Sequence, residues 1–246
     1  MNRWKRVFFD LDNTLFDYER AFELASKQTF SQWSAAEKNG VHVDQWFNLF
    51  KEACDRLWPD YENGHLSRKS YQALRFQQSL QTFHIEVSQN IALWFEHQFK
   101  KQIPDFIDLY DGVELLLEFL CAHNIELGII SNGDYHLQLK KMNRLSIFKW
   151  IPSENIYVTD ESGKVKPSSS MFDLVIQNRS GNPSESLFVG DSWDLDVVGA
   201  ISAGWNALHL NTSGVPPSTD HEPFHSAATF KEIYERRNVL FLMDDQ

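Results

Sequence analysis

Two aspartates stand directly after a short apolar segment near the beginning of the chain. In VFFDLDNTLF, residues 7–9 are apolar and of strand-forming type, and Asp10 and Asp12 follow at once, with Asn13 and Thr14 behind them. Two carboxylates at the end of a buried strand cost free energy unless a cation meets them. A divalent metal ion with a phosphorylated substrate would be such a partner, and open α/β sheets bind ligands at the carboxyl ends of their strands. The pattern therefore predicts metal-assisted chemistry on a phosphate at this strand end.

Further groups of polar residues follow in the chain, each after a predicted strand or in a loop before a helix. They are Ser131-Asn132-Gly133 after an apolar stretch, Lys166 in GKVKPSSSMF, and Gly190-Asp191 with Asp196 in GDSWDLDVVGA. The residue types and their order match phosphoryl transfer through an aspartate nucleophile.

The acidic residues suit definite parts of that reaction. A carboxylate that attacks a phosphate dianion needs a metal ion to screen the two anions, and Mg²⁺ prefers oxygen ligands with one or two protein carboxylates. Asp10 and Asp191 offer such ligands, and the backbone carbonyl of Asp12 is a further candidate. The side chain of Asp12 then remains for acid–base catalysis, first on the leaving alkoxide and later on the water that cleaves the aspartyl-phosphate.

The remaining polar residues can bind the phosphate. Lys166 carries a compact positive charge for the phosphoryl oxygens, and Ser131, with the backbone N–H groups of Asn132 and Gly133, offers hydrogen-bond donors. Taken alone, residues 131–133 also fit an ordinary strand-to-helix turn, and Lys166 fits an exposed lysine. The assignment therefore depends on all the groups occurring together.

Alternating strand and helix patterns after residue 104 place these groups on one sheet. Strands are predicted near residues 126–130, 156–159, 186–189 and 207–210, and helices near 113–123, 137–145, 171–178, 197–203 and 229–237. Strands separated by such helices form a parallel sheet with crossover helices. The predicted fold class is α/β, with a doubly wound, Rossmann-like parallel sheet. In helix 113–123, Leu115, Leu116, Phe119 and Leu120 are predicted to share one face.

Residues 17–102 have a different character and interrupt this core. Apolar residues recur there at helical spacing and breaks fall near 39–40, 59–64 and 83–87, which predicts about four mutually packed helices. The expected domains are a core of residues 1–16 and 103–246 and an all-helical cap of residues 17–102. Because the insert leaves the chain directly beyond Asp12, we expect it to act as a lid over the strand ends.

Two sets of side chains in the insert have open roles. Aromatic residues at helical spacing more often form a core than a base-stacking pocket; those of the insert include Trp33, Trp46, Trp58, Tyr71, Phe76 and Trp94. Arg68 and Arg75 lie on nearly one helical face and could reach an anionic substrate, although a solvated or salt-bridged face is the commoner outcome.

Composition narrows the class of protein. Of 246 residues, 42% are hydrophobic and 23% charged, as is usual for globular proteins. The chain has 34 acidic and 23 basic residues, a net charge of −11, which argues against nucleic acid or an anionic membrane as a partner. Cys54 and Cys121 form no ligand cluster and indicate buried free thiols in a reducing compartment. No apolar stretch has bilayer-spanning length. We expect a cytoplasmic protein, as a monomer or a homodimer.

In these motifs the sequence resembles the haloacid dehalogenase (HAD) superfamily hydrolases, in the phosphatase branch with a helical cap after the first motif. The matching segments are FFDLDNTLF, GIISNGD, GKVKPSSSMF and FVGDSWDLDVVGAISAGW, in the family's order and across most of the core. The resemblance implies Mg²⁺ as the cofactor and a doubly wound parallel sheet. It implies Asp10 as nucleophile and metal ligand, Asp12 as acid/base with its carbonyl on the metal, Ser131 and Lys166 on the phosphate, Asp191 on the metal and Asp196 behind these ligands.

The sequence thus predicts a Mg²⁺-dependent phosphomonoesterase that acts on a small phosphorylated metabolite. VFFDLDNTLF with this cap also resembles a nucleoside 5′-monophosphatase subgroup, and sugar phosphates remain open. A 2-haloacid dehalogenase would use the same Asp10 but needs neither a metal nor an acid at position 12, so Asp12 argues against it. A non-catalytic binding or regulatory protein of this fold needs no acid–base residue, so the complete residue set argues against that alternative as well.

Overall fold

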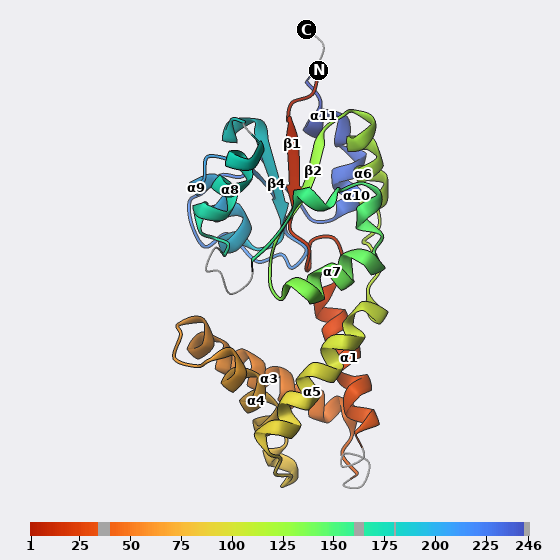
Figure 1. Cartoon of the computed structure of the whole chain (residues 1–246), viewed down its shortest axis with the longest axis vertical. Helices are drawn as coiled ribbons and strands as arrows, with labels where there is room; N and C mark the ends of the chain where they lie inside the picture. The colour runs from red at the N-terminus through yellow and green to blue at the C-terminus, as the bar shows by residue number, and fades with distance from the viewer. Residues whose placement is uncertain (34–39, 160–164, 180, 244–246) are drawn as a thin grey trace. The chain divides into compact units, whose positions relative to one another are not determined.

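The computed structural model describes residues 1–33, 40–159, 165–179 and 181–243. The chain divides into two compact units, Met1–Tyr18 with Ile107–Gln246, and Glu19–Phe106 (Figure 1). We call the first the sheet unit and the second the helical unit. The boundaries predicted from sequence, after residues 16 and 102, each fall a few residues earlier.

Within its described residues, the sheet unit is built on six parallel strands. In spatial order they are β3 (Ile156–Thr159), β2 (Glu126–Asn132), β1 (Arg6–Phe9), β4 (Ser186–Gly190), β5 (Asn206–Leu210) and β6 (His225–Ala227). The helices are α6 (Val113–Ala122), α7 (Tyr135–Arg144), α8 (Ser169–Arg179), α9 (Gly199–Ser202), α10 (Phe230–Glu235) and α11 (Arg237–Phe241). Figure 1 shows α8 and α9 on one face of the sheet and α6 and α10 on the other. The predicted α/β fold with a doubly wound parallel sheet is confirmed.

Strand β1 lies inside the sheet, between β2 and β4. Phe9 is in register with Ile129 of β2 and with Val189 of β4. The N–H of Asp10 continues this ladder and donates to the carbonyl of Val189 over 2.9 Å. Residues that follow these strands therefore meet at one edge of the sheet, the carboxyl edge at which such folds bind ligands.

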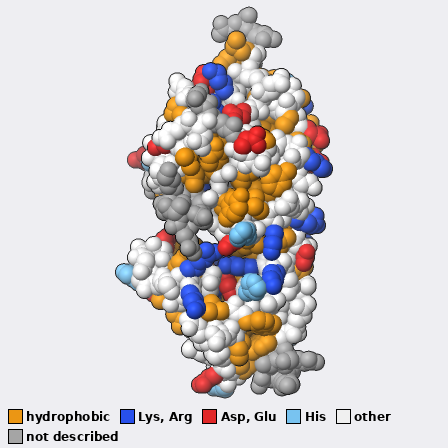
Figure 2. All heavy atoms as spheres, viewed as in Figure 1, with side chains coloured by type: hydrophobic (Ala, Val, Ile, Leu, Met, Phe, Trp, Pro, Cys, Tyr) orange, Lys and Arg blue, Asp and Glu red, His pale blue; other side chains and the backbone are white. Residues whose placement is uncertain are grey.

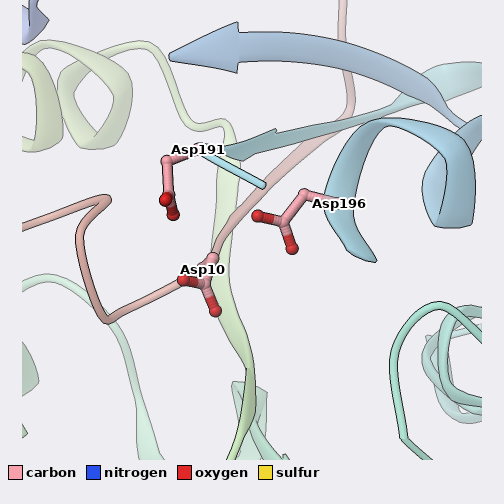
Figure 3. A group of neighbouring side chains, drawn as sticks. All are labelled: Asp10, Asp191 and Asp196. Carbon is pink, nitrogen blue, oxygen red and sulfur yellow. The ribbon is translucent and has the colours of Figure 1, made fainter. Parts of the chain in front are cut away.

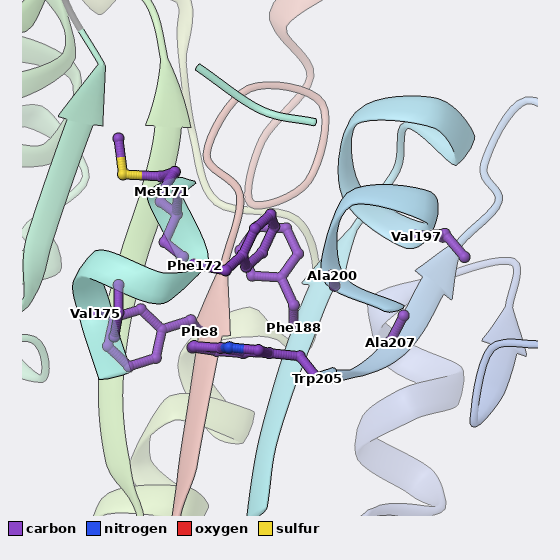
Figure 4. Packing of buried hydrophobic residues seen from close by; sticks show 10 residues of the cluster. Phe8, Met171, Phe172, Val175, Phe188, Val197, Ala200, Trp205 and Ala207 are labelled. Carbon is purple, nitrogen blue, oxygen red and sulfur yellow. The ribbon is translucent and has the colours of Figure 1, made fainter. Parts of the chain in front are cut away.

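An aromatic core joins α8 to one face of the sheet (Figure 4). The ring of Phe8 meets Trp205 edge-on with centroids 5.6 Å apart, and Phe172 of α8 meets Phe188 of β4 at 5.2 Å. Gly128 of β2 leaves room for Phe8, because a Cβ there would lie 2.1 Å from the ring. Burial of these rings drives the packing that keeps β1 and β4 side by side.

The helical unit contains α3 (Val43–Glu62), α4 (Arg68–Ser79), α5 (Gln89–Gln102) and almost all of α1 (Tyr18–Gln32). Trp46 stacks on Phe30 with centroids 3.9 Å apart, and its indole N–H donates to the hydroxyl of Ser79 over 2.9 Å. Phe76 stacks on Phe95 at 4.1 Å. These contacts make the centre of the unit an aromatic core.

The six aromatic residues named from the insert differ in burial, and Trp33 is half-buried. Trp46, Tyr71 and Phe76 are buried, as the core interpretation expects. Trp58 and Trp94 are 46% and 45% exposed, so helical spacing did not predict their position correctly.

Arg75 lies inside the helical unit and forms a buried ion pair with Glu96. Its guanidinium carbon is 5.0 Å from the ring centroid of Tyr71, within cation–π range. Burial raises the pKa of the Glu96 carboxyl, but Arg75 and Lys100 outweigh burial and hold that pKa below its ordinary value. The salt-bridged alternative therefore applies to Arg75, whereas Arg68 is exposed.

Several features of the sheet unit differ from the sequence-based expectations. Strand β6 and helix α11 were not predicted. Leu115 is 48% exposed and does not share the buried face, because α6 turns Val113, Leu116, Leu117 and Leu120 inward. Cys121 is exposed, contrary to prediction, while Cys54 is buried.

No helix in the described part of the chain is long and apolar enough to cross a membrane. On the face drawn in Figure 2, acidic and basic side chains are mixed with apolar ones. The net charge of −11 is therefore not gathered into one acidic patch on that face.

Candidate active site

Three aspartates converge at the carboxyl edge of the sheet (Figure 3). Asp10 follows β1, Asp191 follows β4, and Asp196 lies in the π-helical segment Trp193–Val198. One carboxylate oxygen of each lies within 4.8 Å of the others. We call these three residues the acid cluster. Asp10 and Asp196 are only 7% and 1% exposed, so their charges need partners.

Lys166 is the cation that contacts the acid cluster in the described part of the chain. Its ammonium group donates to Oδ1 of Asp10 and to Oδ1 of Asp196, each over 2.6 Å. The side chain of Asn132 fixes the backbone of Lys166, since Nδ2 donates to its carbonyl and Oδ1 accepts from its N–H, both over 3.0 Å. The end of β2 therefore determines where the lysine stands. The side chain of Asn132 thus holds the backbone of Lys166, whereas the backbone N–H of Asn132 is the group that the sequence predicts to contact the phosphate.

Among the residues that the structure describes, the three carboxyl groups of the acid cluster share a single lysine. Burial raises the pKa of Asp10 to about 8; Lys166 opposes that shift, and Asp196 and Asp191 add to it. Burial, assisted by Asp196, raises the pKa of Asp191 to about 6. Burial alone would lower the pKa of Lys166, but Asp10 and Asp196 outweigh it and raise that pKa. An added divalent cation would favour the ionised carboxylates.

Short contacts orient the acidic residues that follow β4. The hydroxyl of Thr14 donates to Oδ1 of Asp191 over 3.0 Å and accepts from the N–H of Asp191 over 3.1 Å. The N–H of Ser192 donates to Oδ2 of Asp196 over 3.0 Å. A Cβ on Gly190 would lie 2.3 Å from that same Oδ2, so glycine is needed for the close approach of Asp196.

The donor set fits Mg²⁺, which prefers hard oxygen ligands in small number. In the described part of the chain, Lys166 bonds one oxygen of Asp10 and Thr14 bonds one oxygen of Asp191. Both oxygens of Asp196 accept hydrogen bonds, one from Lys166 and one from a backbone N–H. Asp10 and Asp191 would therefore be the better ligands for a metal ion, and Asp196 is better placed to hold Lys166.

Asp12 contacts a different set of side chains, on helix α7. The ammonium group of Lys141 donates to both carboxylate oxygens of Asp12, each over 2.8 Å. Nε2 of Gln138 lies 3.1 Å from Oδ2 of Asp12 and 2.8 Å from Oγ of Ser131. The amide of Gln138 thereby joins two residues that the sequence assigned separately to acid–base catalysis and to the phosphate.

The predicted site residues thus fall into two connected groups. Asp10, Lys166, Asp191 and Asp196 form one; Asp12 and Ser131, linked by Gln138, form the other. Asn132 contacts both groups, through Lys166 and through Gln138. Contacts of Thr14, Gln138 and Lys141 were not predicted. A usable signal existed for the last two, because they are three positions apart and so share one face of the helix that follows GIISNGD.

A family model for haloacid dehalogenase-like hydrolases matches residues 4–204 of the chain. The pyrimidine 5′-nucleotidase YjjG of Escherichia coli (strain K12) is 26% identical over 211 residues, which cover 85% of this chain and 87% of that protein. The glyceraldehyde 3-phosphate phosphatase of Methanothermobacter thermautotrophicus is 25% identical over 224 residues, 88% of this chain and 90% of that protein.

Solved structures share the fold. A magnesium-bound crystal structure of the HAD-hydrolase YfnB from Bacillus subtilis has a TM-score of 0.81 at 24% identity, and the match covers 96% of this chain and 99% of that chain. A 2-haloacid dehalogenase from Pseudomonas syringae has a TM-score of 0.65 at 23% identity, and the match covers 96% of this chain and 99% of that chain. The fold alone therefore does not distinguish a phosphatase from a dehalogenase. Since the family model spans the segments that carry Asp10, Asp12, Lys166 and Asp191, this chain belongs to the haloacid dehalogenase-like hydrolase family.

Proposed function

We propose that the protein is a Mg²⁺-dependent phosphomonoesterase that works through an aspartyl-phosphate on Asp10. The observation that carries the proposal is the buried arrangement of Lys166 between Asp10 and Asp196, beside Asp191. A nucleophilic carboxylate, a fixed cation and a second metal-binding carboxylate are what transfer of a phosphoryl dianion to an aspartate requires.

In the proposed first step an oxygen of Asp10 forms a bond to phosphorus while the ester P–O bond breaks. Asp12 gives a proton to the leaving oxygen. In the second step Asp12 removes a proton from water, which attacks phosphorus and frees Asp10 as a carboxylate. Lys166 offsets the negative charge on the phosphoryl oxygens in both steps. In the proposal, Asp10, Asp191 and the backbone carbonyl of Asp12 would hold Mg²⁺. The metal ion would screen the negative charges of the Asp10 carboxylate and of the substrate phosphate from each other.

The proposed substrate is a small phosphorylated metabolite. Relatives named as a pyrimidine 5′-nucleotidase and a glyceraldehyde 3-phosphate phosphatase support that class. Nucleoside 5′-monophosphates are the members to test first, followed by sugar phosphates. We further propose the helical unit as the cap that selects the leaving group, because family members of this branch carry their helical insert at the same place in the chain.

Phosphate release from p-nitrophenyl phosphate tests the proposal. The wild-type protein with Mg²⁺ should release phosphate, and EDTA should abolish release. Asp10→Asn should be inactive yet folded, while the matched control Asp194→Asn should be fully active, because Asp194 is exposed and bonds only the hydroxyl of Ser218 in the described part of the chain. Turnover that survives EDTA, or an active Asp10→Asn variant, would rule out this mechanism and reopen the dehalogenase alternative.

A further inference from the structure

Lys141 is a buried lysine whose charge is directed at one residue. Its side chain is 2% exposed, and its ammonium group donates to both oxygens of Asp12 over 2.8 Å. A buried ammonium group is costly to desolvate, so it persists only with a well-placed anion. Contact with both oxygens constrains the carboxylate more than a single hydrogen bond would, because it fixes the rotation of the group as well as its place.

The surroundings of Lys141 are built for this contact. Its ammonium nitrogen lies 4.5 Å from the ring centroid of Tyr18 and 5.8 Å from that of Phe16, both within cation–π range. The two rings and Asp12 come from the same short segment after β1. The lysine therefore fastens helix α7 to the segment that carries the proposed acid/base.

Gln138 adds a second hold on Asp12 from the same helix face. Its amide nitrogen lies 3.1 Å from Oδ2 of Asp12, 2.8 Å from Oγ of Ser131 and 3.1 Å from the carbonyl oxygen of Asn132. Asp134 caps the start of α7 by accepting from the N–H of Leu137 over 2.9 Å. This cap fixes the register of the helix and so places Gln138 and Lys141 toward the site.

We propose that Lys141, with Gln138, positions the carboxylate of Asp12 for proton transfer. The inference rests on the proposed function and adds a residue that touches neither substrate nor metal. The two oxygens of a carboxyl group have about four sites for protons or hydrogen bonds. Lys141 and Gln138 use three of them on Asp12, so the fourth can carry the proton for the leaving oxygen and, once ionised, can face the attacking water. Geometry of this kind matters because a displacement of about 1 Å can cost on the order of 10²-fold in rate.

The test is steady-state kinetics of Lys141→Met with Lys140→Met as the matched control. Lys140 is the neighbouring, exposed lysine of α7, so its substitution removes the same charge without touching Asp12. Lys141→Met should lower kcat by about 10- to 10²-fold with KM unchanged, Lys141→Arg should recover part of the loss, and Lys140→Met should match wild type. Thermal unfolding checks that each variant is folded; should Lys141→Met fail to fold, Lys141→Gln, which removes the charge but keeps a polar side chain, replaces it and should lower kcat in the same range.

A double-mutant comparison separates positioning from mere structural support. If Lys141 acts through Asp12, adding Lys141→Met to Asp12→Asn should change kcat by less than about twofold, because the group being positioned is already gone. A full additional loss in the double variant, or wild-type kcat in Lys141→Met or its replacement Lys141→Gln, would overturn the positioning role while leaving the phosphatase proposal intact. A wild-type protein that hydrolyses no phosphomonoester would overturn both.

Discussion

The ammonium nitrogen of Lys166 lies 2.6 Å from Oδ1 of Asp10, although the two residues are 156 positions apart in the chain. The contact exists because β1 and β2 are adjacent and Asn132, at the end of β2, holds the backbone of Lys166. It brings a cation to the proposed nucleophile, and the same cation reaches Asp196.

Removing this cation should destabilise the protein in a metal-dependent way. In Lys166→Met the buried carboxylates of the acid cluster lose the lysine that bonds Asp10 and Asp196, and breaking a buried ion pair costs about 3–5 kcal/mol. We expect a loss of this size in the free energy of unfolding measured in EDTA, a smaller loss in excess Mg²⁺, and no turnover. Lys140→Met is the control for loss of one charge. Equal stability of Lys166→Met and wild type in EDTA would contradict the assignment.

The contact between Gly190 and Asp196 gives a steric prediction. A methyl group in Gly190→Ala would lie 2.3 Å from Oδ2 of Asp196, so the carboxylate must move and its bond to the N–H of Ser192 must lengthen. We expect a loss of about 1–3 kcal/mol in stability, as for other overpacked sites, and a fall in kcat because Lys166 loses its support. Calorimetry and steady-state kinetics measure the two effects; wild-type values for both would show that Asp196 tolerates displacement.

The ion pair of Glu96 with Arg75 gives a pH-dependent prediction for the helical unit. Glu96→Gln leaves Arg75 buried without its anion, which should cost about 3–5 kcal/mol at neutral pH. The pKa of Glu96 is lowered in the folded protein, so the contribution of its charge is complete above its ordinary value of 4.5 and is lost as pH falls through the lower, folded value. The difference in unfolding free energy between wild type and Glu96→Gln should therefore shrink below about pH 4.5.

Denaturant titrations across this pH range measure that difference. Glu62→Gln, which changes an exposed glutamate of α3, is the control and should match wild type throughout. If Glu96→Gln has the same unfolding free energy as wild type at neutral pH, or if the difference grows on acidification, the Arg75–Glu96 ion pair does not stabilise the helical unit.

Sequence patterns predicted those strands whose residues both favour extended structure and are buried in the sheet. Apolar runs that end in polar clusters marked β1, β2 and β4, and so placed Asp10 and Asp191 correctly at strand ends. Strand β6 was missed because His225–Ala227 is short and contains a single apolar residue, and an edge strand is specified mainly by its neighbour.

The site was harder to predict wherever the burial of a side chain differs from what is usual for that residue type. Lysine is almost never fully buried without a partner, and only the fold reveals that Asp12 is the partner of Lys141. Leu115 and Trp58 are exposed although both are large and apolar. Helical spacing indicates which side of a helix is apolar, but not how far the buried part of that side extends. Contacts between segments far apart in the chain cannot be read from spacing alone.

Detection of the covalent intermediate tests the central proposal most directly. Asp12→Asn should still accept the phosphoryl group from p-nitrophenyl phosphate, whose leaving group needs little protonation, but should hydrolyse the intermediate slowly for lack of a base. After incubation with Mg²⁺ and an acid quench, peptide mass spectrometry should find the phosphoryl group on Asp10, and none in Asp10→Asn. Release of p-nitrophenol with no phosphoryl group on Asp10, or with one on another residue, would contradict the account.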